Sequence, residues 1–196
     1  NSGGFSNFNN NLFSTSLEEK LWMPTSIGKE LSTIAIPLPE SPGRPSLLSF
    51  GKGRSPFPSP KSLQEDSKRA EALLFFANHE LLAIELMSLC ILRFPETPWK
   101  FRRGLMNIIS EEQEHLRLYM TRARELGKEI GSVPVNRFFW DNLYTMRSPE
   151  EFLCAMSLTF EQANLDDVSI FGGQEVYAAM FGLFRFSLLF LVVVPL

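Results

Sequence analysis

The stretch from residue 97 to residue 126 reads TPWKFRRGLMNIISEEQEHLRLYMTRAREL, and it decides the fold. At about 100° per residue, its apolar side chains fall on one face of a helix, and Glu112 and His115 share that face. A buried carboxylate and imidazole are costly unless they are paired or bound to a metal. A Glu and a His at this i, i+3 spacing form the ligand module of di-iron and di-manganese four-helix bundles. The stretch therefore points to a metal site in an all-α protein.

The composition limits the classes of partner and compartment. The chain has 196 residues and a net charge of −3, with Lys and Arg scattered along it. We expect no nucleic-acid partner, because such a partner needs a concentrated basic face. Cys90 and Cys154 lie in apolar helical patterns, which predicts two buried thiols in a reducing, cytoplasmic setting. The sequence starts at Asn1 without a signal-peptide pattern, so we interpret it as processed or as a fragment.

The first 62 residues are rich in Pro, Ser and Gly, which predicts a loop-like N-terminal arm. Two short apolar groups, Ile34-Ala35-Ile36 and Leu47-Leu48, are expected to clamp this arm onto the surface of the helical domain. No chemistry is readable in this region. The helical domain itself is expected over residues 63–170, and an apolar C-terminal segment over residues 171–196.

Two long helices should open the helical domain. The first is predicted from Ser62, which has capping-box spacing to Glu65, to about Arg93. It is apolar nearly all round, which is typical of a buried central helix, and its four polar residues argue against a membrane span. The second runs from Thr97-Pro98 to about Leu126 and stops at Gly127. The short link between them predicts antiparallel neighbours.

A longer connection, residues 127–147, follows, with room for a short helix around its aromatic group Phe138-Phe139-Trp140. Ser148-Pro149-Glu150-Glu151 then has the spacing of a helix start, with an N-cap serine, a proline at the first helical position and a capping box. This third helix should run to about Ile170. A helix pair, a long crossover and another helix is the connectivity of ferritin-like bundles.

Acidic residues on buried faces complete the candidate metal site. Glu80 and Glu85 in the first helix mirror Glu161 and Asp166 in the third, with the same spacing of five. We predict four ligands of iron or manganese, a choice based on their carboxylate and imidazole chemistry: Glu80, Glu112, His115 and Glu161. The alternative is that Glu112 and His115 hydrogen-bond to each other inside the core.

Several neighbours of these ligands are expected to have other roles. His79 should be exposed or lie outside the ligand set, and Tyr119 is interpreted as a core residue. Glu85 and Asp166 point away from the ligand face and are predicted to form salt bridges or caps. Glu111 and Glu114 should stay solvated.

The C-terminal segment Val176–Leu196 holds a single charge, Arg185, and its length would just cross a bilayer. It is interpreted either as a membrane anchor or as a buried fourth helix. Arg185 disfavours the membrane, because a charge at the centre of a bilayer costs about 2.5–3.5 kcal/mol on insertion scales. We therefore expect the segment to pack on the other helices.

Four longer strings of the chain are specific: FFANHELLAIEL (75–86), EEQEHLRLY (111–119), PVNRFFW (134–140) and SLTFEQANLD (157–166). Through them the chain resembles a known family, the uncharacterised ferritin-like proteins called the domain of unknown function 455 family. The resemblance covers roughly residues 42–167. It implies a ferritin-like bundle with a carboxylate-bridged di-metal centre, and it supplies no established reaction.

The chain departs from the family pattern after about Asp167, where the family continues into a helix with a second Glu-x-x-His. The chain has only two histidines, His79 and His115, so that motif is absent. By the family layout, Glu80, Glu112 and His115 preserve one half-site, and Glu161 is left without its partners. The fourth helix is accordingly expected to be incomplete or substituted.

Two functions stay open at this point. One is a metal-binding, oxygen-activating oxidoreductase that holds half of a di-metal site. The other is a non-catalytic structural or interaction protein that retains the bundle. The sequence leaves a homo-oligomer open.

Overall fold

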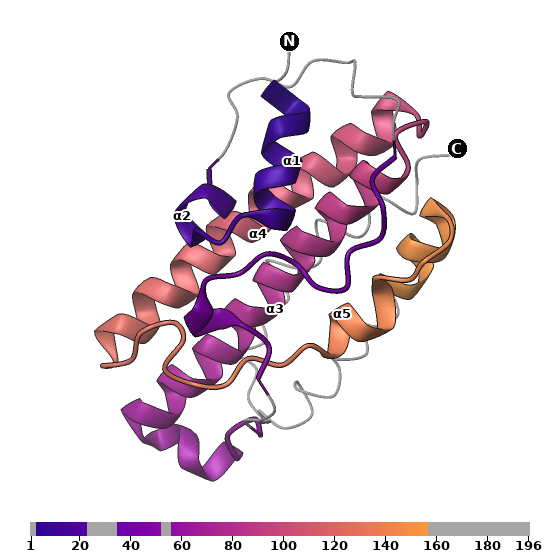
Figure 1. Ribbon diagram of the computed structural model, residues 1–196. Coiled ribbons are helices and arrows are strands. Elements are labelled where there is room, and N and C mark those ends of the chain that lie inside the picture. The colour runs from indigo at the N-terminus through magenta and orange to yellow at the C-terminus, as the bar shows by residue number, and fades with distance from the viewer. Residues whose placement is uncertain (1–2, 23–34, 52–55, 157–196) are drawn as a thin grey trace.

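A computed structural model describes residues 3–22, 35–51 and 56–156, and side chains from residue 8 onward. The regular structure within these ranges is all helical, as predicted (Figure 1). The predicted continuation of the third helix beyond residue 156, with Glu161 and Asp166, falls outside the described residues, as does the Val176–Leu196 segment. The elements in chain order are α1 (Gly3–Phe13), α2 (Leu17–Lys20), η1 (Ser46–Leu48), η2 (Pro60–Gln64), α3 (Asp66–Arg93), α4 (Trp99–Glu125) and α5 (Phe138–Leu143).

Helix α3 is the buried centre of the described structure. Every residue from Glu80 to Leu92 is buried, because α4, α1 and the segments around them pack on it. This confirms the prediction of a buried central helix that ends at Arg93. Among the described residues, α3 is the one helix long and apolar enough to cross a membrane, and 83% of its most apolar window is buried inside the protein.

The start of α3 differs from the prediction. The helix begins at Asp66, and its N-cap residue Glu65 makes no capping hydrogen bond through its side chain. Residues 60–64 instead form the short 3-10 helix η2, which opens at Pro60. Ser62 lies inside η2, where its hydroxyl donates to the carbonyl oxygen of Ser59 at 2.7 Å, and it is not the N-cap residue of α3. The predicted capping box at Ser62 is therefore wrong.

Helices α3 and α4 form an antiparallel hairpin, as the short link predicts (Figure 1). Pro98, predicted as the first helical residue, is the N-cap residue of α4, so the helix begins one residue later, at Trp99. At the other end, Gly127 adopts a φ of 86°, a left-handed conformation that favours glycine. The amide of Gly127 donates to the carbonyl of Arg124 at 2.9 Å, and the amide of Lys128 donates to that of Ala123 at 3.0 Å. These two bonds are a complete Schellman motif, which explains why α4 stops here.

The N-terminal arm is more structured than predicted. Residues 3–13 form helix α1, whose Phe8 and Leu12 are buried against α3. Figure 1 shows α1, α2 and the violet segment 35–51 lying over the α3–α4 pair. The predicted clamp is confirmed at two positions, because Leu48 is buried and half-buried Ile36 packs on the core. Gly and Asn are poor helix formers, so the sequence of α1 does not predict a helix. Tertiary packing stabilises the helix instead.

The connection after α4 contains the expected short helix, α5, and leads to a helical segment that is described over residues 149–156. Ser148 caps this segment as predicted, because its Oγ accepts the amide of Glu151 at 3.2 Å. The Glu151 carboxylate accepts the amide of Arg147 at 2.9 Å, so the reciprocal bond of a capping box falls one residue earlier than expected.

Both cysteines are free, but only one of them is buried. Cys90 lies inside α3, and burial raises the pKa of its thiol. Cys154 is exposed, which corrects the prediction that both thiols are buried. The residue lies in the helical segment at the end of the described chain, where an apolar pattern alone does not establish which face is covered.

Candidate metal centre

Glu80 projects from α3, and Glu112 and His115 project from the facing side of α4. Each of the three offers a ligand atom, and these atoms all lie within 4.8 Å of one another. All three residues are buried. The structure therefore brings together three of the four residues that the sequence predicts as ligands. Glu161, the fourth, lies outside the described residues.

Within α4, Glu112 and His115 contact each other directly. The Nδ1 atom of His115 lies 2.8 Å from Oε2 of Glu112, within hydrogen-bonding distance across one helical turn. This hydrogen bond raises the pKa of His115 above its ordinary value, against the opposing effect of burial. The contact is the one expected if the pair is satisfied inside the core without a metal.

Glu80 is in a less favourable environment. Burial raises the pKa of its carboxyl well above the ordinary value, and the negative charge of Glu112 and a hydrogen bond with it act in the same direction. The Oε2 atom of Glu80 is buried, and no hydrogen-bond donor reaches it from the described residues. A buried anion next to another anion needs either a proton or a cation. A metal ion at the centre of the cluster would supply that cation, so the donor set fits one metal ion.

His79 and Tyr119 lie beside the cluster without joining it. His79 is half-buried among aromatic rings, with centroids 4.3 Å from Phe75 and 4.7 Å from Phe139, and burial lowers its pKa to about 3. Tyr119 packs on Phe76 at a centroid distance of 5.9 Å, and burial followed by the charges of the nearby carboxylates raises its pKa. The interpretation of Tyr119 as a core residue is confirmed.

The remaining predictions about acidic residues also hold where they are described. Glu111 and Glu114 are exposed on α4. Glu85 forms salt bridges, as expected, with two cations of the arm. Its carboxylate lies 3.1 Å from Nζ of Lys20 and 2.7 Å from Nη2 of Arg44, and all three side chains are buried. Sequence reasoning missed both cations, because nothing in the local pattern of the arm marks them as buried.

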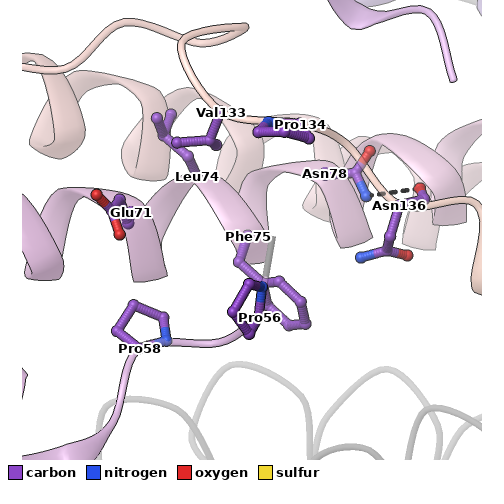
Figure 2. Close-up of a pocket in the computed structure, with 9 residues that line it drawn as sticks. All are labelled: Pro56, Pro58, Glu71, Leu74, Phe75, Asn78, Val133, Pro134 and Asn136. Atoms are coloured by element: carbon purple, nitrogen blue, oxygen red, sulfur yellow. Dashed lines mark hydrogen bonds between the residues drawn. The ribbon is translucent and has the colours of Figure 1, made fainter. Parts of the chain in front are cut away.

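Two cavities lie between residues 56–62, α3 and the segment after α4, and none of the three clustered ligands lines them. Figure 2 shows the smaller one, of about 10 Å³, where Asn78 donates from Nδ2 to the carbonyl oxygen of Asn136 at 3.1 Å. The neighbouring cleft, of about 470 Å³, is bordered by Lys68 and Lys128. Both lysines already pair with Glu71, at 2.8 and 3.0 Å. Neither cavity is therefore lined by Glu80, Glu112 or His115.

No curated protein and no solved structure matches the chain. One family model, described as a protein of unknown function (DUF455), matches residues 7–171. The match begins well before residue 42, so the family includes the arm that covers α3 and α4. The chain therefore belongs to the DUF455 family, as its four sequence strings indicate.

Proposed function

We propose that this chain is a ferritin-like metal-binding protein in which Glu80, Glu112 and His115 bind one ion of iron or manganese. The observation that carries the proposal is the Glu80 carboxyl group. It offers a ligand atom within 4.8 Å of those of Glu112 and His115, and its buried Oε2 atom has no hydrogen-bond donor from the described residues. The antiparallel α3–α4 hairpin, the crossover through α5 and the new helix at residue 149 support the ferritin-like arrangement.

The donor set explains the choice of metal. Two carboxylates and one imidazole combine hard and borderline ligands, which suit iron and manganese. The two carboxylates also offset the charge of a divalent ion in a buried setting, where an uncompensated charge is costly. Glu161 is the candidate for a further ligand. With no second Glu-x-x-His in the sequence, we propose one ion per chain rather than a bridged pair.

Bound iron would supply redox chemistry, and on this basis we propose an oxygen-activating oxidoreductase as the reaction class. The residues of the chain have narrower tasks. Glu80 and Glu112 provide negative charge from two different helices, and His115 adds a neutral donor. The surrounding apolar side chains of α3 and α4 keep water away from these groups.

A second candidate function, a non-catalytic structural protein, is favoured by the contact between His115 and Glu112 at 2.8 Å. If this function is correct, Glu112 and His115 hydrogen-bond to each other inside the core. Glu80 is then neutralised by a proton instead of a metal. The raised pKa of Glu80 is compatible with that state.

Metal analysis of the purified chain separates the two functions. The full chain would be loaded with Fe²⁺ without oxygen, and separately with Mn²⁺, and its metal content measured after desalting. We expect about one ion per chain in the wild type, and its loss in Glu112→Gln and His115→Ala. Glu114→Gln is the matched control, because Glu114 lies on the same helix but is exposed and pairs with Arg117. An unmetallated wild type, or a His115→Ala variant that retains the ion, would overturn the proposal.

A further inference from the structure

The N-terminal arm contacts both metal-bearing helices next to the proposed ligands. Lys20 makes the central contact, because its Nζ atom pairs with Glu85 of α3 at 3.1 Å. Its backbone carbonyl oxygen accepts a hydrogen bond from Nε2 of Gln113 in α4 at 2.7 Å. Gln113 directly follows Glu112, and Glu85 lies on the same helix as Glu80. One residue of the arm therefore joins the two helices that carry the cluster.

Lys20 is also tied to the arm itself. Its fully buried Nζ atom donates to the carbonyl oxygens of Asn11 at 2.5 Å and Leu12 at 3.3 Å. These carbonyls belong to the last turn of α1, where the helix leaves its own acceptors unpaired. Lys20 therefore links α1, α3 and α4 at one point, and each of its donors has a partner.

Two arginine contacts reinforce this link. Arg44 of the arm binds the Glu85 carboxylate through Nε and Nη2, and its Nη1 donates to Oδ1 of Asn78 at 2.9 Å. Arg117 of α4 donates to the carbonyl oxygen of Leu21 in the arm. On α3, the arm is therefore held at positions on either side of Glu80. On α4, it is held at positions on either side of His115.

We propose that Lys20 is a positioning residue of the metal cluster, acting by holding α3 and α4 in the register that brings Glu80 to Glu112 and His115. The inference rests on the proposed metal-binding function. A slip of one helical residue moves a side chain by about 1.5 Å along the axis. A metal site tolerates only about 0.2 Å in its ligand distances, so a small change in register disrupts it.

Binding of Co²⁺ tests this inference, because the visible absorption of the bound ion reports the geometry of its ligands. The full-length chain would be titrated with Co²⁺ as wild type, as Lys20→Met and as Lys68→Met. Lys68 is the matched control, since it also forms an ion pair on α3 but is partly exposed, at 2.8 Å from Glu71. We expect Lys20→Met to bind about 10-fold more weakly, with an altered spectrum at saturation. Lys68→Met should match the wild type in both.

The spectrum separates positioning from a general loss of stability. A variant that is only less stable would still show the wild-type spectrum once its folded molecules are saturated. If the wild type binds Co²⁺ and Lys20→Met has the same affinity and spectrum, the positioning role is wrong while the metal-binding function stands. If the wild type binds no Co²⁺, the metal-binding function fails, and the positioning role fails with it.

A second variant covers the case in which Lys20→Met does not fold. Gln113→Leu removes the contact between the arm and α4 but keeps the ion pair of Lys20 with Glu85. It also removes the Oε1 atom of Gln113, which is buried without a hydrogen-bond partner, so this change is easier for the fold to accept. We expect weaker Co²⁺ binding and an altered spectrum here too. Wild-type values for both would overturn the inference.

Discussion

Glu80 and Glu85 lie five residues apart on α3, and both are almost completely buried, yet their surroundings are opposite. Glu85 accepts from two buried cations, Lys20 and Arg44, at 3.1 and 2.7 Å. Glu80 faces another carboxylate, that of Glu112, and none of the described Lys or Arg side chains forms an ion pair with it.

Burial of a carboxylate therefore does not by itself indicate a metal site. At Glu85, the chain compensates the charge with its own cations, so the group serves the attachment of the arm. At Glu80, no Lys or Arg among the described residues pairs with the carboxylate, so a proton or a metal has to balance its charge. The identity of the facing groups, more than the depth of burial, separates a structural carboxylate from a candidate ligand.

The largest loss of stability is expected from a change at Glu85, whose charge is balanced by Lys20 and Arg44. Glu85→Gln leaves Lys20 and Arg44 buried without their anion, and breaking a buried ion pair costs about 3–5 kcal/mol. Urea unfolding of the variant should show this loss in the free energy of unfolding. Glu71→Gln is the matched control, because Glu71 also joins two cations but is partly exposed, so it should cost about 1 kcal/mol or less. Equal losses in the two variants would remove the basis of the comparison.

The next largest effect is expected at Glu80, through stabilisation of the folded chain by a bound metal. A metal that binds only the folded state stabilises it by about 2.7 kcal/mol when the free ion is at 100 times its dissociation constant. Mn²⁺ should therefore raise the unfolding free energy of the wild type, and EDTA should reverse the change. Glu80→Gln should lose most of this gain, whereas Glu114→Gln should keep it. A similar Mn²⁺ effect in wild type and Glu80→Gln would mean that the ion binds elsewhere.

The labelling rate of the Cys90 thiol measures how often α3 opens. It can therefore show whether α3 opens more often when the contacts between Glu85 and the arm are lost. This thiol is buried in the same helix, and burial raises its pKa, so it reacts only when the structure opens. In a Cys154→Ser background, thiol labelling should be at least about 10-fold faster in Glu85→Gln, because each 1.4 kcal/mol of destabilisation allows tenfold more opening. Glu80→Gln should label no faster than the wild type. Fast labelling of the wild type itself would contradict the burial of this helix.

The smallest effect is expected for Glu80→Gln without metal. The raised folded pKa of Glu80 means that the wild type is stabilised at low pH and loses that stability as pH rises through this pKa. Gln has no such loss, so in EDTA the variant should be as stable as the wild type near pH 5, within about 1 kcal/mol, and more stable at pH 8. Chemical unfolding at the two pH values measures the difference. A variant that becomes relatively less stable with rising pH would show that Glu80 has a cation in the metal-free chain.

Local patterns explain which parts of the fold and site were predictable. The ends of α4 and the facing positions of Glu80, Glu112 and His115 follow from helical periodicity, a proline, a glycine and a short link. The start of α3 was missed because residues 60–64, which include Ser62, form the separate 3-10 helix η2. Cys154 was misplaced because an apolar helix pattern does not say which face is covered.

Regular spacing along the helices was enough to predict the all-α class and the cluster of Glu80, Glu112 and His115, and four sequence strings were enough to indicate the family. The role of the arm became visible only in the folded chain. Helix α1 is built from poor helix formers, and its stability comes from packing Phe8 and Leu12 on α3. The pairing of Lys20 with Glu85 joins residues far apart in the chain, and no local periodicity relates two such positions.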